Sequence, residues 1–186
     1  LEALIPFILG NMQLNDELVI LDDYSDLKTQ MVLDTYVNNG NYNIKFHQRK
    51  LNGDFASHKN FMNSMCSGEW IFNIDADEIP CDFLMQNIKP LIKANPEVEL
   101  FWVPRINIVN GITNEHIQRW RWRVDENNWV NWPDPQQRLY KNVPHIRWER
   151  KVHERLIGAK VDAPLPFEKD WALRHVKTID KQEQQN

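Results

Sequence analysis

The sequence is poor in cysteine, has no excess of positive charge and contains no long hydrophobic run. Two cysteines are too few for a disulfide scaffold in a chain of 186 residues, which favours a reducing compartment. A net charge of −4 argues against a nucleic-acid partner, since nucleic-acid-binding surfaces are basic. No stretch approaches the roughly 18 apolar residues of a transmembrane helix, and the first residues lack the pattern of a secretory leader. We therefore expect a protein of the cytoplasm or of the membrane periphery.

The length suits one domain with a hydrophobic core, so residues 1–186 are expected to form a single domain. A hydrophobic fraction of 42% with 26% charged residues is typical of a soluble globular protein. Tryptophan is unusually abundant, and most of the eight tryptophans lie between residues 120 and 148. Tryptophan suits cores, protein interfaces and the apolar faces of sugar rings, so composition alone leaves these roles open.

Apolar patterning in the first half predicts alternating helices and strands. Helices are expected at 1–12, 27–38, 55–66 and 82–95, and strands at 17–23, 43–48, 70–74 and 97–109. Pro90 should kink or interrupt the last of these helices. The alternation is typical of an α/β fold with a mostly parallel central sheet flanked by helices. Beyond residue 109 only short strands are expected, as a small additional β region towards the C-terminus, at 136–141, 145–148 and 170–176.

Acidic residues follow two of the expected strands. The segment LDD ends with Asp22 and Asp23, and the segment IDADE (74–78) ends a buried strand. Carboxylates this close repel one another unless a positive charge lies among them. Because ligands of open α/β sheets bind beyond the carboxyl ends of the strands, these acids predict a binding site. Glu78 and Asp82 would also suit the N-terminus of the following helix, whose dipole favours negative charge.

Three chemistries place D-x-D after an apolar strand. A calcium loop is excluded, because Ile79, Pro80 and Gln86 stand where it needs an oxygen ligand, a glycine and a glutamate. A phosphatase of the haloacid dehalogenase type, with Asp75 as nucleophile and Asp77 as acid, remains an alternative. A nucleotide-sugar transferase would use these carboxylates to hold Mg²⁺ or Mn²⁺ on the diphosphate of the leaving group.

Four motifs in order along the chain carry a family resemblance. They are VILDDYSD, NGDFASHKNFMNSMCSGEWIFNIDADE, WPDPQQRLY and RKVHERL. The first resembles the second strand and nucleotide-binding turn of the family 2 glycosyltransferases, which have the Rossmann-like GT-A fold. The second is similar to that family's helix, Gly-Glu-aromatic turn and metal-binding D-x-D, and the last two resemble the branch whose motif reads D-A-D-E. The resemblance covers about residues 1–176, and the family's first strand would precede residue 1.

The resemblance implies an inverting, metal-dependent transferase of the hexosyltransferase class. Its donor would be a nucleoside diphosphate sugar in which the nucleotide is UDP. Its acceptor would be a saccharide, a glycoconjugate or another compound with a hydroxyl group. Residues 1–109 would form the nucleotide-sugar-binding half and residues 110–180 the acceptor side. Such an enzyme belongs to carbohydrate biosynthesis.

The resemblance also implies roles for individual acids and one histidine. Asp22 or Asp23 would accept a hydrogen bond from the uracil or the ribose. Asp75 would face the ribose or a water on the metal. Asp77 would bind Mn²⁺ or Mg²⁺ directly, and His153 would be a further metal ligand or a diphosphate contact.

The catalytic base and the acceptor contacts are less defined. Inversion needs a carboxylate that takes the proton of the acceptor hydroxyl, and Glu154 is slightly favoured over Asp134, which could be a turn residue between two prolines. Arg138 would meet the diphosphate or pair with a core carboxylate. Trp129 and Trp132 are expected platforms for an acceptor sugar. A non-catalytic carbohydrate-binding module is a further alternative, suggested by the aromatic residues.

Overall fold

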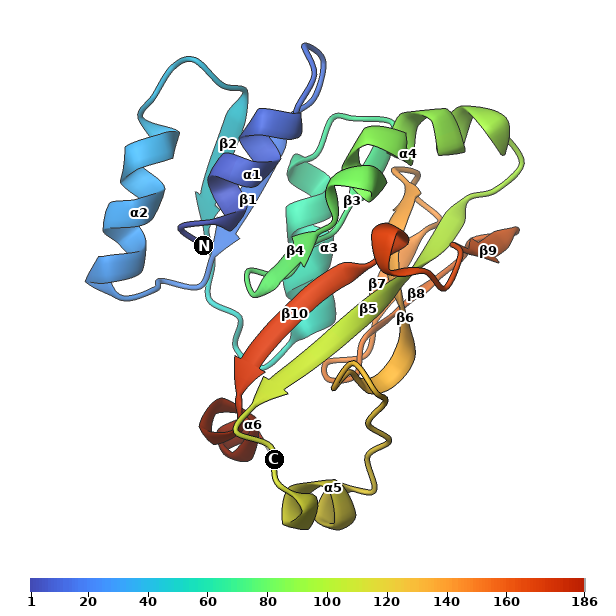
Figure 1. The fold of residues 1–186 in the computed structure, drawn as a ribbon. Coiled ribbons are helices and arrows are strands. Elements are labelled where there is room, and N and C mark those ends of the chain that lie inside the picture. The colour runs from blue at the N-terminus through green and yellow to red at the C-terminus, as the bar shows by residue number, and fades with distance from the viewer. Residues whose placement is uncertain (186) are drawn as a thin grey trace. The chain divides into compact units, whose positions relative to one another are not determined.

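The computed structural model describes residues 1–185 and consists of two compact units (Figure 1). The first unit contains residues 1–73 and 139–161, and the second contains residues 74–138 and the described residues from 162 onward. The chain passes from the second unit into the first within strand β6 (Val130–Lys141). Each unit is therefore built from two separate stretches of sequence.

The first unit begins with a small parallel sheet covered by helices. Strand β1 (Leu18–Asp22) pairs in parallel with β2 (Ile44–Gln48), and the flanking helices are α1 (Leu4–Asn11) and α2 (Leu27–Val37). The side chain of Asp26 accepts from the backbone N–H of Thr29 and so caps the start of α2. The apolar faces of these elements meet in one core, whose fully buried members are Ile5, Leu9 and Leu33.

The rest of the first unit comprises α3 (Phe55–Met65), β3 (Trp70–Phe72) and the hairpin of β7 (Arg147–Glu149) and β8 (Arg155–Ile157). Strand β3 pairs antiparallel with the last residues of β6. The amide of Asn60 on α3 bonds to both the N–H and the C=O of Trp148, at 2.9 and 2.8 Å. This side chain ties the helix to the hairpin.

The second unit is built around two long strands. Strand β10 (Leu173–Thr178) pairs in parallel with β5 (Leu100–Asn110) and antiparallel with β4 (Glu78–Pro80), and β9 (Asp162–Pro164) pairs in parallel with β5. The helices are α4 (Asp82–Ala94), α5 (Asn114–Trp120), the 3-10 turn η1 (Lys169–Trp171) and α6 (Ile179–Gln185). The core includes Leu84, Val103 and Leu173, which are fully buried.

The α/β class expected from the sequence is confirmed, with each predicted element of the first half present within a few residues of its expected bounds. The strand pairs are of both kinds. They are parallel for β1–β2, β5–β10 and β5–β9, and antiparallel for β4–β10, β3–β6 and β7–β8. Helix α4 includes Pro90, so this proline does not end the helix, and Leu84 near the start of α4 is fully buried. Helix α5 and the first half of β6 were not predicted, because the apolar residues there recur at neither helix nor strand spacing.

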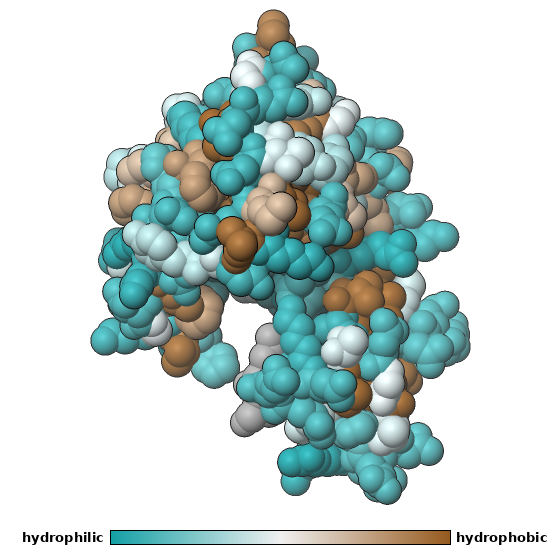
Figure 2. All heavy atoms as spheres, turned by 90° about the vertical axis from the view of Figure 1, so that its left-hand side faces the viewer, coloured by the Kyte–Doolittle hydropathy of each residue, from teal (hydrophilic) through white to brown (hydrophobic). Residues whose placement is uncertain are grey.

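Within residues 1–185 we find no helix with the length and apolar character needed to cross a membrane. The face seen in Figure 2 is mainly hydrophilic, with hydrophobic residues in small separate groups. Scattered apolar residues of this kind are normal on protein surfaces.

A carboxylate ties the turn after α3 to the start of β1 in the first unit. Glu17 accepts from the N–H of Gly68 at 2.9 Å and from the hydroxyl of Ser67 at 2.8 Å, and Lys45 Nζ lies 2.6 Å from Glu17 Oε2. Burial opposes ionisation of Glu17, but these hydrogen bonds outweigh it and lower the pKa of Glu17 from 4.5 to about 2.

Glu17→Gln should lower the free energy of unfolding by about 1 to 3 kcal/mol at neutral pH, because it removes charge-assisted hydrogen bonds. Since the folded pKa is depressed, this contribution is fully present above pH 4.5 and is lost as the pH falls towards about 2. Urea unfolding of the two proteins should therefore converge in acid. Glu2→Gln, at an exposed position, is the control and should stay within about 0.5 kcal/mol throughout. A Glu17 effect that does not shrink in acid would contradict this role of the charge.

Candidate active site

The acids of the IDADE segment lie in a turn that leads into β4, in the second unit. The N–H of Glu78 donates to the C=O of Asp75 at 2.9 Å, and the N–H of Asp75 donates to Glu78 Oε2 at 3.1 Å. Glu78 is fully buried, whereas the side chains of Asp75 and Asp77 are 41% and 36% exposed. The interpretation of Glu78 as a helix N-terminal residue was wrong: it lies on β4, and Asp82 alone begins the helix.

Two arginines supply positive charge to this turn. Arg138 is 3% exposed and donates to Glu78 Oε1 at 2.6 Å and to Asp75 Oδ2. Arg105 Nη1 donates to the same Glu78 oxygen at 3.0 Å. Burial opposes the charge on Arg138, but Glu78 and Asp75 outweigh this and raise the pKa of Arg138. Of the two roles open to Arg138, the structure shows the pairing with a core carboxylate, that of Glu78.

Asp77 has two basic neighbours from the C-terminal segment. Lys181 Nζ on α6 donates to Asp77 Oδ2 at 2.9 Å, and His175 Nε2 on β10 lies 3.4 Å from the same oxygen. The hydrogen bond with His175, joined by that of Lys181, outweighs partial burial and holds the pKa of Asp77 well below its usual range. Asp77 is therefore ionised at neutral pH.

His175 is a residue of this site that sequence reasoning missed. It lies opposite Glu78 in the β10–β4 pair, and its Nδ1 is 2.8 Å from Asn107 Oδ1. The Asn107 amide is oriented by its own Nδ2, which donates to Asp134 Oδ2 at 2.8 Å. Because Asn107 Oδ1 can only accept, His175 Nδ1 must carry a hydrogen in this arrangement. A single histidine on a strand belongs to no motif, and only its burial in the structure distinguishes it.

Asp134 lies on β6 and is held by several donors. Its Oδ2 accepts from Arg105 Nε at 2.9 Å, from Arg105 Nη2 at 2.8 Å and from Asn107 at 2.8 Å, while Oδ1 accepts from Gln136 at 2.8 Å. Since a carboxylate oxygen has two lone-pair sites, Oδ2 is fully used and Oδ1 keeps one. Asp134 is a strand residue of the ion-pair network rather than a turn residue.

Asp22 and Asp23 lie at the C-terminal end of β1 in the first unit. Both oxygens of Asp22 are 3.2 Å from the N–H of Ser25, and Asp22 Oδ2 also accepts from Gln48 at 3.1 Å. Burial opposes ionisation of Asp22, but these hydrogen bonds outweigh it and lower the pKa of Asp22. Asp23 is exposed and accepts from the N–H of Leu51 at 2.8 Å. Asp22 therefore shapes its own turn, and Asp23 faces solvent.

His153 and Glu154 lie in the loop between β7 and β8 of the first unit. His153 is exposed and has a left-handed backbone, with φ of 52°. Glu154 Oε1 lies 2.7 Å from Lys59 Nζ, which itself lies 4.4 Å from the centre of the Trp148 ring. Because the two residues are in a loop, their side chains are not forced to opposite faces as on a strand.

Trp129 and Trp132, the predicted sugar platforms, are in contact in the second unit. Their ring centres are 5.1 Å apart, and the ring planes are inclined by 68°. Both rings are partly exposed, so each offers part of its surface to solvent. This edge-to-face pair fixes the orientation of both indoles.

The carboxylates of this turn fit a divalent cation that takes part of its coordination shell from a substrate. Asp77 is a partly exposed, ionised carboxylate, and the Asp75 carboxylate lies two residues away in the sequence. Among the described residues no group of three or more His, Cys, Asp and Glu side chains is arranged to hold a metal alone. Mg²⁺ is usually bound by one or two carboxylates together with phosphate oxygens and water, and the site suits only binding of that kind.

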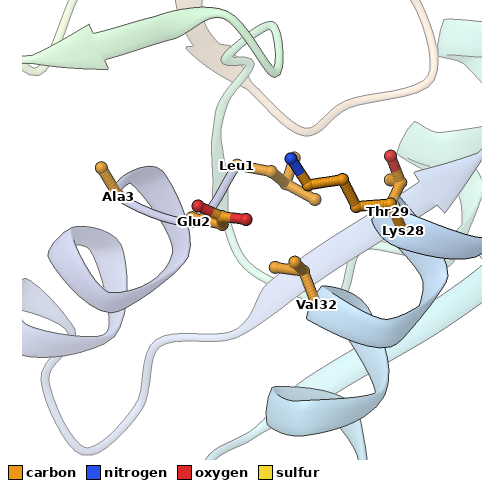
Figure 3. Close-up of a pocket in the computed structure, with 6 residues that line it drawn as sticks. All are labelled: Leu1, Glu2, Ala3, Lys28, Thr29 and Val32. Carbon is orange, nitrogen blue, oxygen red and sulfur yellow. The ribbon is translucent and has the colours of Figure 1, made fainter.

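Two depressions lie in the first unit away from these residues. One, of about 310 Å³, lies between Leu1–Ala3 and the α2 residues Lys28, Thr29 and Val32 (Figure 3). The other, of about 450 Å³, lies between α3 and the end of β6. Neither is lined by a residue to which the sequence assigned a role.

Comparison with known proteins identifies the family. The family model Glycosyl transferase family 2 matches residues 1–152. Lipopolysaccharide core biosynthesis glycosyltransferase LpsC of Rhizobium meliloti (strain 1021) is 30% identical over 122 residues, which are 64% of this chain and 44% of LpsC. The chain thus spans less than half the length of that curated relative. The chain belongs to glycosyl transferase family 2, as its motifs predicted.

Solved structures share the fold. S. aureus TarS 1-349 matches with a TM-score of 0.62 and 16% identity over 93% of this chain and 55% of TarS 1-349. The same protein in complex with UDP matches with a TM-score of 0.62 and 15% identity over the same shares. At this identity the likeness concerns the fold alone, and it confirms the expected GT-A fold. Membership of this family decides against a phosphatase of the haloacid dehalogenase type.

The buried arginine gives a stability prediction. Arg138→Met should lower the free energy of unfolding by about 3 to 5 kcal/mol, because it leaves the buried Glu78 with one cation fewer. The matched control is Arg147→Met, which breaks a 3.0 Å pair with Glu149 whose side chains are 55% and 42% exposed. That change should cost about 0 to 1 kcal/mol in denaturant unfolding. Equal losses in the two variants would contradict a structural role for the charge on Arg138.

Proposed function

We propose that this chain transfers a sugar from a UDP-sugar to a hydroxyl group of a saccharide or glycoconjugate, with inversion at the anomeric carbon. Family membership supports sugar transfer. The observation that carries the assignment of the site is the turn that presents Asp75 and Asp77 to solvent on a base of buried Glu78 and Arg138. UDP is the nucleotide in the TarS complex of the same fold, which agrees with a uridine donor.

The nucleoside contact is assigned to Asp23 in preference to Asp22. The oxygens of Asp22 already accept from Ser25 and Gln48, so this carboxylate holds the turn after β1. Asp23 is exposed and keeps lone pairs available to the uracil or to the ribose hydroxyls. Both residues thus contribute to binding of the UDP-sugar. Asp22 shapes the turn after β1, and Asp23 contacts the nucleoside.

Asp77 is the proposed protein ligand of Mn²⁺ or Mg²⁺, with Asp75 facing the ribose or a water of the cation. The imidazole of His175 lies at Asp77, and His153 remains the second histidine candidate. When bound, such a cation neutralises charge on the departing diphosphate. Lys181 and His175 both contact Asp77 Oδ2, so the Oδ1 atom of Asp77 is the proposed ligand atom.

The transfer itself exchanges one bond to the anomeric carbon for another. The acceptor hydroxyl oxygen forms a bond to that carbon, the bond from the carbon to the diphosphate oxygen breaks, and UDP leaves with the electron pair. We assign removal of the hydroxyl proton to the carboxylate of Glu154, whose Oε1 is oriented by Lys59. Asp134 is the alternative base, with one lone pair left on Oδ1. Trp129 and Trp132 are the proposed acceptor platform.

The donor and metal assignments are tested by thermal stability. The correct UDP-sugar with Mn²⁺ should raise the free energy of unfolding by about 2.7 kcal/mol at a hundredfold excess over its dissociation constant. Asp77→Asn should remove the Mn²⁺-dependent part of this gain while the unliganded protein stays folded. Asp82→Asn, an exposed acid at the start of α4, is the control and should keep the full gain. Unchanged Mn²⁺ dependence in Asp77→Asn would remove Asp77 from the metal site.

The base assignment is tested by transfer rates. Glu154→Gln should slow transfer about 10²- to 10⁴-fold while UDP and Mn²⁺ still bind, because only proton removal is lost. Asp134→Asn should have a mild effect on the rate if this residue only orders its neighbours. An inactive Asp134 variant beside an active Glu154 variant would exchange the two roles. Full activity of both would show that the base lies elsewhere.

A further inference from the structure

Three arginines alternate with two tryptophans at the end of α5 in the second unit. Arg119, Arg121 and Arg123 are exposed, and no acidic residue lies between Glu115 and Asp125. The chain as a whole has a net charge of −4. Segment 116–124 is therefore a local basic surface on an acidic protein.

The neighbouring acids leave much of this charge uncompensated. Asp125 Oδ1 accepts from the N–H groups of Asn127 and Trp129, at 2.9 and 2.8 Å. Glu183 on α6 lies 3.8 Å from Arg119 and 3.6 Å from His116 Nε2. In the part of the chain that the structure describes, the guanidinium groups of Arg121 and Arg123 have no ion-pair partner. These two groups are free to meet an external anion.

Aromatic rings support the arginines. The rings of His116 and Trp120 are stacked, with centres 5.4 Å apart and planes inclined by 13°, and the Trp122 ring centre is 4.7 Å from that of Trp120. The guanidinium of Arg119 lies 5.7 Å from the Trp120 ring centre. Both indoles are partly buried, and a ring that is apolar on its faces and polar at one N–H suits the boundary between water and lipid.

The backbone of the segment is fixed by specific contacts. Arg121 ends α5 in the left-handed conformation, with φ of 54° and ψ of 40°, which favours glycine over any residue with a side chain. The N–H of Arg123 donates to Asn131 Oδ1 at 3.0 Å, and the C=O of Arg123 accepts from the N–H of Asn131 at 2.8 Å. These contacts fix the backbone from which Arg121 and Arg123 extend.

The segment projects from its unit instead of lining a pocket. Helix α5 lies beyond the C-terminal end of β5, out from the strands of the second unit (Figure 1). The two depressions described above are lined by other residues. Because small ligands usually bind in concave sites, a projecting basic and aromatic segment fits an extended anionic surface better.

We propose that segment 116–124 docks the protein on an anionic membrane surface. The guanidinium groups of Arg119, Arg121 and Arg123 bind lipid phosphates, for which their planar donors are suited, and Trp120 and Trp122 lie at the level of the headgroups. Each arginine near such a surface strengthens binding about fivefold. Loss of two arginines should therefore weaken binding about 30-fold.

The experiment is co-sedimentation of the protein with lipid vesicles, in the absence of nucleotide sugar and metal. Binding is expected to vesicles that contain phosphatidylglycerol and not to pure phosphatidylcholine vesicles, and it should weaken as salt is added. The double variant Arg121→Gln/Arg123→Gln should bind about 30-fold more weakly. Lys89→Gln/Lys93→Gln removes the same charge from exposed positions of α4 in the same unit and should bind like the wild type.

Three outcomes would overturn the proposal. The first is no binding to the anionic vesicles, and the second is an equal loss in both double variants, which would show that only net charge matters. The third is arginine-dependent binding of glucose 6-phosphate, measured by calorimetry, without vesicle binding, which would make the segment a site for a soluble phosphorylated saccharide. Because the assay contains no donor, its result is independent of the proposed sugar transfer.

Discussion

Burying Glu78 without contact to water obliges the second unit to bring positive charge to it. A lone buried carboxylate is very costly, and it is tolerated only when it is paired and hydrogen-bonded. Arg138 and Arg105 meet this requirement from two different strands, and the backbone N–H of Asp75 uses the second Glu78 oxygen. The same contacts hold the turn that exposes Asp75 and Asp77. The pairing of one buried acid thus fixes the position of the two acids that face solvent.

A second chain of contacts continues from this pair through the unit. Arg105 also binds Asp134, Asp134 binds Asn107, and Asn107 meets His175, which lies at Asp77. Arg105, Asn107 and His175 each contact two partners in this chain, and the second contact fixes the orientation of the side chain. The network leaves Asp77 ionised and partly open to solvent, which is what an oxygen ligand of a divalent cation requires.

The sequence was informative where one local pattern decides the outcome. Apolar residues recur at helix or strand spacing through the first half, so the helices and strands of that half were predicted. Asp75 and Asp77 were selected as candidate site residues because they come shortly after β3. Strand β6 was only half predicted, because Asn131, Pro133 and Asp134 interrupt any alternation. The basic residues of the site could not be predicted either. Arg105, His175 and Lys181 are distant in sequence from Asp77, and nothing local separates them from the chain's other basic residues.

The ammonium of Lys181 at Asp77 has a consequence for affinity. The ammonium lies 2.9 Å from Asp77 Oδ2, so it already supplies positive charge to this carboxylate. If Asp77 holds a cation as proposed, Coulomb repulsion from Lys181 lowers its affinity for a bare metal ion. A cation that arrives on a diphosphate carries negative charge with it, and that charge offsets the repulsion. Under the proposed function, Lys181 would therefore favour a metal that carries its nucleotide over a bare metal ion.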